Sequence, residues 1–185
     1  MSLALTALPS IDHTPLARLR HSLDAALQEA PASGAFALGM RAALTAVLKE
    51  QGLLSGAQLE GGAESYRRHL LIADPRGRYA VAALVWQPGQ ASPVHGHHTW
   101  CAYAVIEGTL SETLFRWDTD AHRAVETRRQ VRAAGAVSFV GAGRGGIHQL
   151  GNDAGAARQA VSIHVYGVAG GQISTHVNDL LGGVR

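Results

Sequence analysis

Three histidines are spaced so that they could hold a metal ion. His95 and His97 lie two residues apart in a stretch that favours a strand, and alternate residues of a strand point to the same face. His148 follows in a second glycine-rich strand pair. Three neutral imidazoles suit a divalent transition metal and leave coordination positions open for chemistry. The sequence therefore predicts a metal site built from His95, His97 and His148.

A second set of polar side chains lies in the segment Ser162-Ile163-His164-Val165-Tyr166. In a strand, Ser162, His164 and Tyr166 share one face, and the two apolar residues share the other. If the polar face lies inside a barrel, a hydroxyl, an imidazole and a phenol can form a buried hydrogen-bonded relay. The phenol could then donate a proton or a hydrogen bond to a bound substrate. Without the metal motif, the three residues would be interpreted as ordinary strand residues.

Two helices followed by short strands are expected to position these groups. Apolar residues at three- and four-residue spacing predict helices over 14–30 and 36–51, with Thr14-Pro15 at the start of the first and Gly52 ending the second. Residues 53–63 and the glycine-rich segment 141–146 are expected to be loops, and 172–181 a last strand or short helix. The predicted strands are 66–73, 79–87, 92–97, 99–107, 110–117, 126–132, 136–140, 147–151 and 160–166. So many short strands favour a mainly β sandwich or barrel.

Composition favours one domain spanning residues 1–185 and excludes several functions. Sixteen basic and 14 acidic residues give a net charge of +2 without a large basic cluster, so nucleic acid is not an expected partner. No apolar run approaches the ~18 residues of a membrane span, and the first residues do not resemble a signal peptide. Cys101 is the only cysteine, which rules out an intrachain disulfide and fits a reducing cytoplasm.

The glycine-framed histidines resemble the two sequence motifs of the cupin superfamily. The matching positions are Gly89, His95, His97, Cys101 and Gly108 for the first motif, and Gly135, Gly143, His148 and Asn152 for the second. Cys101 stands where most metal-binding cupins have a glutamate, and Gly141 where proline is usual. The resemblance implies a cupin (double-stranded β-helix) barrel over 66–167, preceded by an N-terminal helical segment over 1–55.

The missing glutamate changes the expected metal chemistry. With three neutral ligands, Fe²⁺ would keep its full charge and three free positions. An anionic bidentate substrate could bind there and leave one position for O₂. A thiolate is the obvious anion of this kind, because soft sulfur binds iron.

Within the cupins, the chain resembles the thiol dioxygenases, typified by cysteine dioxygenase. Besides the histidines, the resemblance rests on the segment SIHVYG (162–167), on Trp86 and on Tyr66-Arg67-Arg68. It implies one Fe²⁺ per chain, and an enzyme that oxidises a small thiol with O₂ to a sulfinic acid. Alternate residues of a strand point to the same face, so Arg68 rather than Arg67 is expected to point inward with Tyr66. The implied site residues are His95, His97 and His148 for iron, Tyr166, His164 and Ser162 for catalysis, and Arg68 with Tyr66 for the substrate carboxylate.

Arg68 also bears on which thiol is expected. Bacterial members divide into two types by the residue at the position of Arg68. The arginine type resembles cysteine dioxygenases. The glutamine type resembles 3-mercaptopropionate dioxygenases and tends to carry an arginine soon after the tyrosine that corresponds to Tyr166. This chain has Arg68 and no arginine between Tyr166 and Arg185. L-cysteine is therefore the favoured substrate. Cys101 occupies the position that in animal members is crosslinked to the triad tyrosine, which makes a Cys101–Tyr166 thioether a hypothesis for this chain.

Other interpretations stay open on the sequence alone. The thiol could be 3-mercaptopropionate or mercaptosuccinate. A three-histidine cupin of different chemistry, such as diketone cleavage, would not need the relay that ends at Tyr166, and a non-enzymatic cupin would only bind a small ligand. His98 should face away from His97 on a strand and is expected outside the metal cluster, near the entrance. The chain is expected to be a monomer or a small homo-oligomer.

Overall fold

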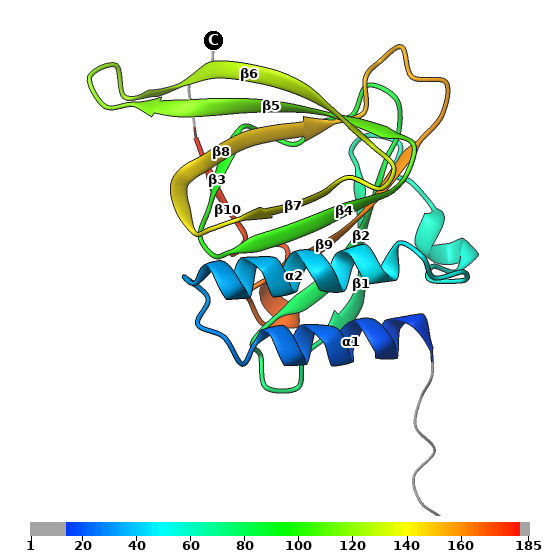
Figure 1. Ribbon diagram of the computed structural model, residues 1–185. Helices are drawn as coiled ribbons and strands as arrows, with labels where there is room; N and C mark the ends of the chain where they lie inside the picture. Colours follow the sequence, from blue (N-terminus) through cyan, green and yellow to red (C-terminus); the bar gives the residue numbers. More distant parts are fainter. Residues whose placement is uncertain (1–13, 182–185) are drawn as a thin grey trace, which may run out of the picture.

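The computed structural model describes residues 14–181, and residues 1–13 of the predicted helical segment lie outside the described range. The helices are α1 (Pro15–Ala26) and α2 (Gly34–Val47), and two short 3₁₀ turns are η1 (Gly56–Leu59) and η2 (Gly170–Gln172) (Figure 1). The strands are β1 (Arg67–Ala73), β2 (Ala80–Trp86), β3 (His95–His97), β4 (Cys101–Glu107), β5 (Thr109–Asp118), β6 (Arg123–Ala133), β7 (Val137–Val140), β8 (Gly143–Gly151), β9 (Ala160–Tyr166) and β10 (Asn178–Leu180).

The strands form two five-stranded sheets that face each other. The first has the order β1-β2-β9-β4-β7 and the second the order β10-β3-β8-β5-β6. Their inner faces meet in one buried cluster that includes Ala80 and Tyr103 from the first sheet and Leu110 and Leu150 from the second. The predicted fold class, a mainly β cupin barrel with N-terminal helices, is confirmed.

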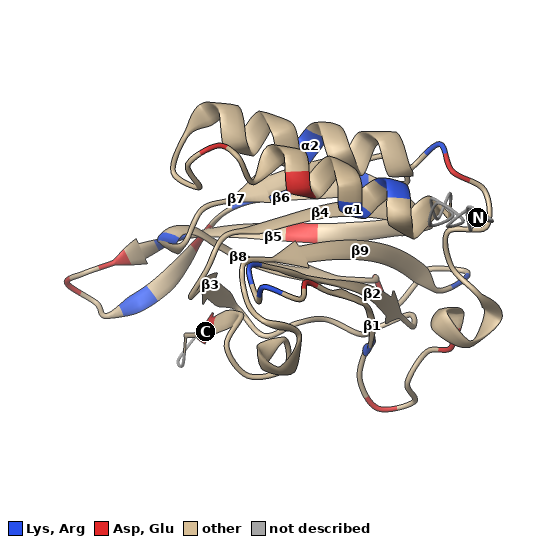
Figure 2. Ribbon diagram, turned by 90° about the horizontal axis from the view of Figure 1, so that it is seen from below, with Lys and Arg blue, Asp and Glu red and all other residues tan. Residues whose placement is uncertain are grey.

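Both helices lie on the same side of the molecule, over the first sheet (Figure 2). Phe36, Met40 and Leu44 follow one another at four-residue spacing on the buried face of α2 and pack with Ala102 and Ile163 of the sheet. Burial of side chains of this size stabilises the fold by about 1.5–3 kcal/mol each. Because the barrel interior covers the other face of this sheet, β2 and β9 are buried along their whole length.

Both helices begin at side-chain caps and end earlier than predicted. The Thr14 hydroxyl accepts a hydrogen bond from the Ala17 amide at 3.3 Å, as the Thr14-Pro15 pair predicted. The last helical residue of α1 is Ala26 rather than residue 30. The amides of Gln28 and Glu29 bond the oxygens three residues back instead of four, and Ala30, which precedes Pro31, is disfavoured in helical conformation. α2 ends at Val47 rather than 51. Gly52 has a positive φ of 68° but lies in the turn that follows, so the prediction that it ends the helix is wrong.

The strand boundaries differ from the prediction where glycine obscures the pattern. Strand β8 begins at Gly143, inside the segment predicted as a loop, because its backbone pairs with β3 at His97. β3 itself contains only three residues. At the other end, β10 pairs with β3 and extends the second sheet beyond the predicted limit at residue 167. The predicted loop 53–63 contains the turn η1.

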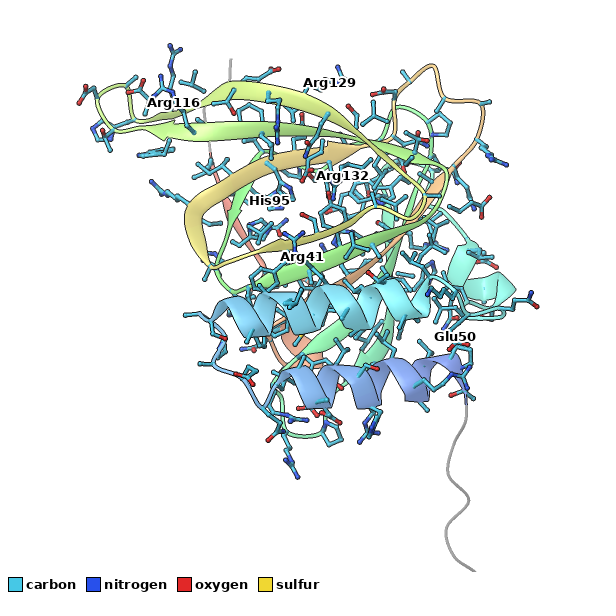
Figure 3. All side chains as sticks on the ribbon, in the orientation of Figure 1. Arg41, Glu50, His95, Arg116, Arg129 and Arg132 are labelled. Carbon is cyan, nitrogen blue, oxygen red and sulfur yellow. The ribbon has the colours of Figure 1, made fainter. Side chains whose placement is uncertain are left out.

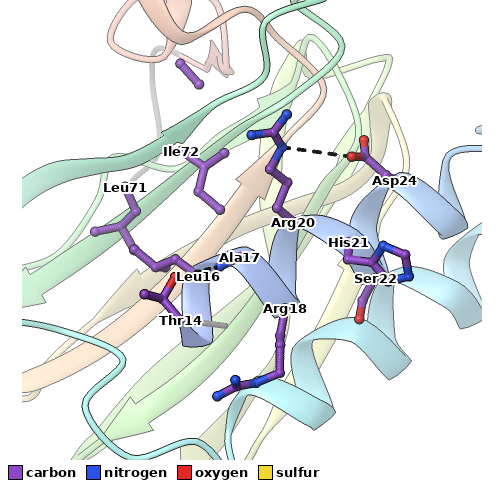
Figure 4. A pocket seen from close by; sticks show the side chains of 11 residues that line it. Thr14, Leu16, Ala17, Arg18, Arg20, His21, Ser22, Asp24, Leu71 and Ile72 are labelled. Carbon is purple, nitrogen blue, oxygen red and sulfur yellow. Dashed lines mark hydrogen bonds and ion pairs between the residues drawn. The ribbon is translucent and has the colours of Figure 1, made fainter. Parts of the chain in front are cut away.

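An ion-pair network connects α1 to the turn between β1 and β2. The Arg78 guanidinium donates hydrogen bonds of 2.8 Å to both carboxylate oxygens of Asp74, and it also contacts Asp24 of α1. Asp24 in turn lies 4.0 Å from Arg20, in the lining of an open groove between α1 and β1 (Figure 4). Asp74 is buried, and its hydrogen bonds with Arg78 lower its pKa to about 2.

Replacing Asp74 by asparagine should therefore weaken the fold at neutral pH. Since the folded-state pKa is below the ordinary value of 3.8, the carboxylate stabilises the fold above that value, and the contribution disappears as the pH falls towards 2. The shift alone corresponds to about 2 kcal/mol, but Arg78 is 29% exposed, and screening by water reduces the expected loss to about 1 kcal/mol. Urea unfolding at about pH 7 and about pH 2.5 measures this loss. The prediction would be contradicted if the difference in unfolding free energy between variant and wild type were as large at about pH 2.5 as at about pH 7.

Candidate metal centre

The three predicted histidines come together between the two sheets. His95 and His97 are supplied by β3 and His148 by β8, and His95 is the direct cross-strand partner of His148. All three are buried, their ring centroids are 4.7–5.0 Å apart, and their possible ligand atoms lie within 4.8 Å of one another. Figure 3 shows His95 in this position. Nitrogen donors this close can share one metal ion.

Hydrogen bonds fix the ring state of two of these histidines. His95 Nδ1 lies 2.9 Å from the backbone oxygen of Pro93, and a carbonyl oxygen can only accept. The proton must therefore be on Nδ1, which leaves the lone pair of Nε2 free. His148 Nδ1 lies 2.8 Å from a carboxylate oxygen of Glu112, which fixes its ring in the same way. In metal sites, a hydrogen bond of this kind on the second ring nitrogen orients the ligand.

The surroundings keep the imidazoles of His95 and His97 neutral. Burial lowers the pKa of His95 to about 4 and that of His97 to about 3, and the neighbouring His148 adds to both shifts. At neutral pH both rings are therefore in the form that binds metals. Three buried imidazoles fit a divalent transition metal better than calcium or magnesium, which take oxygen ligands.

Glu112 is a buried residue of the site that the sequence interpretation did not identify. It lies on β5 and is 2% exposed. Burial alone would raise the pKa of its carboxyl group, but the hydrogen bond from His148 and interactions with Gln130 and Arg132 outweigh it and lower the pKa. Leu110, two residues earlier on the same face, is fully buried. The alternation of residues along the strand could have indicated that Glu112 is buried, because it shares a face with the apolar Leu110.

Arg68 and Tyr66 line the same cavity as the three histidines. The Arg68 guanidinium is 5.9 Å from the ring centroid of Tyr66 and 5.8 Å from that of Tyr166. The Tyr66 ring stacks on Trp86, with centroids 4.3 Å apart. Arg68 donates one hydrogen bond of 2.7 Å to the Ile173 carbonyl, while its Nε has no partner among residues 14–181. Aromatic rings thus hold the guanidinium in place while part of its donor capacity is unused.

Ser162, His164 and Tyr166 all point into the interior, as their alternation predicted. The indole of Trp86 donates to the Ser162 hydroxyl at 2.9 Å, and this hydroxyl lies 2.9 Å from His164 Nε2. His164 is stacked between two phenol rings, with centroids 5.2 Å from Tyr103 and 5.7 Å from Tyr166. The first step of the predicted relay is therefore a hydrogen bond, whereas the contact between His164 and Tyr166 is a ring stack.

Cys101 lies directly opposite Tyr166 in the pairing of β4 with β9. Its thiol is buried, and burial raises the thiol pKa, so the group is neutral. Directly opposed residues of an antiparallel pair have Cβ atoms roughly 4.5–5.5 Å apart. The strand register therefore places the Cys101 side chain beside that of Tyr166.

These groups line one small cavity of about 20 Å³. Its lining contains the three histidines, Arg68, Tyr66, Trp86, Cys101, His164 and Tyr166, and also Leu84, Ser92, Leu150 and Asn178, which the sequence interpretation did not identify. Ser162 lies behind His164 and outside the lining. His98 is exposed and outside the metal cluster, as its strand parity predicted.

Two facing sheets with three inward histidines define a metal-binding cupin. The family described as Cysteine dioxygenase type I matches residues 61–176, more than half of the chain. The chain belongs to this family. It is 28% identical over 103 residues to "Cysteine dioxygenase type 1" of Homo sapiens and 26% identical over 103 residues to the Bos taurus protein, and each match covers 55% of this chain. The chain spans about half the length of these curated relatives, 50% in both cases.

Two solved structures resemble the chain only distantly. The protein TT1209 of Thermus thermophilus is 20% identical, with a TM-score of 0.48, and the match covers 62% of this chain and 95% of that one. A Cupin 2 conserved barrel domain protein from Salinispora arenicola is 21% identical, with a TM-score of 0.45, and the match covers 68% of this chain and 92% of that one. No helix among the described residues is long and apolar enough to cross a membrane.

Proposed function

We propose that this protein is a non-haem iron(II) thiol dioxygenase with L-cysteine as its preferred substrate. The observation that carries the proposal is that three buried histidines and the Arg68 guanidinium line the same small cavity. The reaction, R–SH + O₂ → R–SO₂H, places both oxygen atoms in the sulfinic acid and needs no further reductant. The low number of charged residues in the lining and the small cavity favour a small substrate with a single carboxylate.

The substrate is held at two ends in this proposal. Iron bound by His95, His97 and His148 would supply a binding position for the thiolate and the means to activate O₂. Arg68 would bind the carboxylate as a bidentate pair. The nearby rings of Tyr66 and Tyr166 restrict the guanidinium, so that less side-chain freedom is lost when substrate binds.

Tyr166 would act as a hydrogen-bond donor rather than as a base. Burial raises the pKa of its phenol well above the ordinary value, with a further rise from Cys101 and an opposing effect of Arg68. The Tyr166 oxygen therefore keeps its proton at neutral pH and can donate it in a hydrogen bond to the reacting substrate. Ser162 fixes the ring of His164, which in turn stacks against the phenol and orients it.

The test is oxygen uptake by iron-reconstituted protein with a set of thiols. L-cysteine should stimulate uptake, with one sulfinate formed for each O₂ consumed, and should have a higher kcat/KM than 3-mercaptopropionate or mercaptosuccinate. A preference for one of those acids would change the substrate but keep the reaction. No thiol-stimulated uptake would overturn the proposal. If diketone substrates were cleaved instead, and Tyr166→Phe kept full activity, the alternative three-histidine chemistry would replace it. The proposed location is the cytoplasm, because a chain with one cysteine cannot form an intrachain disulfide, which fits a reducing compartment.

A thioether between Cys101 and Tyr166 is expected to form during turnover. The two residues are direct cross-strand partners. The new bond joins Sγ to a ring carbon beside the phenol oxygen. The S–H and C–H hydrogens leave as two protons and two electrons, which reduce one O₂ to H₂O₂. Intact protein should therefore become lighter by two hydrogens, and a tryptic digest should contain one linked peptide. The Cys101→Ser variant serves as the control and should show neither change. An unchanged wild-type mass after turnover would refute the crosslink.

A further inference from the structure

A cluster of polar side chains lies behind the histidines and contacts one of them, His148. It consists of Glu112 on β5, Gln130 and Arg132 on β6, and their contact with His148 on β8. One oxygen of Glu112 lies 2.8 Å from His148 Nδ1. The other accepts a hydrogen bond of 2.7 Å from the Gln130 amide and lies 3.5 Å from Arg132 Nε.

The backbone register accounts for this contact. Leu114 is the cross-strand partner of His148, and Glu112 lies two residues away on the same face of β5. Diagonal neighbours of this kind are within reach of a long side chain. Gln130 is the direct partner of Glu112 on the other side, so its amide engages one carboxylate oxygen and leaves the second for the imidazole. The pairing of three strands thus holds the carboxylate in one orientation.

The charged groups around the Glu112 carboxylate indicate its role. Burying an ionised carboxylate is unfavourable unless close partners compensate it. Arg132 is a distant partner at 3.5 Å, whereas the His148 contact is the shorter one. None of the side chains that line the cavity is acidic. A divalent ion at the histidines would therefore have the negative charge of Glu112 one imidazole ring away.

We propose that Glu112 is a positioning residue for the metal. It holds His148 with the proton on Nδ1, directs the Nε2 lone pair at the ion, and makes the ring a stronger donor by accepting its hydrogen bond. The proposal rests on the proposed function only in requiring that a divalent metal binds at the three histidines. The role of Glu112 does not depend on which substrate binds, and it requires neither a thiol nor O₂.

Metal affinity tests this role without reference to activity. Co²⁺ is titrated into metal-free protein in competition with a chromophoric chelator, and the wild type is compared with Glu112→Gln. Because Gln keeps the size of the side chain and an accepting oxygen, the variant removes mainly the charge. We expect Co²⁺ affinity to fall by about 10–100-fold, the usual effect of substituting a residue that hydrogen-bonds a metal ligand, because the loss of the negative charge makes the His148 ring a weaker donor. Glu126→Gln is the matched control, since Glu126 is an exposed residue of the same sheet. The Co²⁺ affinity of this variant should equal that of the wild type. Equal affinity of Glu112→Gln and wild type would overturn the proposal.

A measurement on the wild type covers the case in which the variant does not fold. Nitrogen-15 NMR of metal-free protein reports which ring nitrogen of each histidine carries the proton, and His148→Ala identifies the signals of His148. The proposal requires the proton of His148 to be on Nδ1, and a proton on Nε2 would overturn it. Tight Co²⁺ binding that depends on Glu112, together with no thiol-stimulated O₂ uptake, would leave this role intact and remove the proposed function instead.

Discussion

Replacing His97 by alanine should abolish both metal binding and thiol-dependent oxygen uptake. The variant removes one of three buried nitrogen donors, and loss even of a hydrogen-bond partner of a ligand can reduce metal affinity by about 100-fold, so the loss here should be larger. His97 is the best of the three histidines to replace, because its ring forms no hydrogen bond to another side chain within residues 14–181, whereas the ring of His148 holds Glu112. The fold should therefore tolerate the change. Metal content after reconstitution measures metal binding, thermal unfolding measures the stability of the fold, and oxygen uptake with thiols measures the activity.

His98→Ala is the matched control for this experiment. The same side chain is removed one residue further along, but His98 is exposed and outside the metal cluster. Its metal content and oxygen uptake should equal those of the wild type. A His97→Ala protein that is folded and still oxidises thiols would remove the metal site from the mechanism. One that loses metal but still binds a small ligand with full affinity would favour the non-enzymatic interpretation.

The histidine cluster was predictable because it depends on local rules. His95 and His97 share a face through the two-residue period of a strand, and glycine-framed turns locate His148 in a second strand pair. The same parity correctly predicted the inward faces of Ser162, His164 and Tyr166, and it also predicted that His98 lies outside the cluster. Each of these predictions needs only the period of one strand and the expectation that its polar face lies inside a barrel.

Other parts of the site depend on pairing between distant strands. The contact of Glu112 with His148 requires the register of β5 on β8, and Asn178 reaches the cavity only because β10 pairs with β3. Neither register leaves a periodic signal in the sequence. Gly143 was predicted in a loop because a glycine contributes no side chain to a strand pattern, although its backbone pairs with His97. Loop predictions fail in this way wherever backbone hydrogen bonds alone define a strand.

Replacing Arg68 by glutamine should reduce kcat/KM for L-cysteine on the order of 10²-fold, which corresponds to about 3 kcal/mol for a lost charge-assisted bidentate pair. The reduction should appear mainly in KM, because the carboxylate is bound in the ground state as well as in the transition state. Arg68 also donates a hydrogen bond to the Ile173 carbonyl, so thermal unfolding must be compared alongside the kinetics. Initial rates of oxygen uptake over a range of cysteine concentrations provide both kinetic constants.

Two comparisons separate carboxylate binding from a general disturbance of the site. Cysteamine has the thiol and amine of cysteine but no carboxylate, so Arg68→Gln should change its kcat/KM little. Arg67→Gln is the matched variant, because Arg67 is exposed and pairs with Glu60 at 3.5 Å on the outer surface, where such pairs contribute little. It should leave the kinetics with both thiols unchanged. If Arg68→Gln reduced the rates with cysteine and cysteamine equally, the guanidinium would act on the reacting centre rather than on the substrate carboxylate, and the argument from Arg68 for an amino-acid thiol would fail.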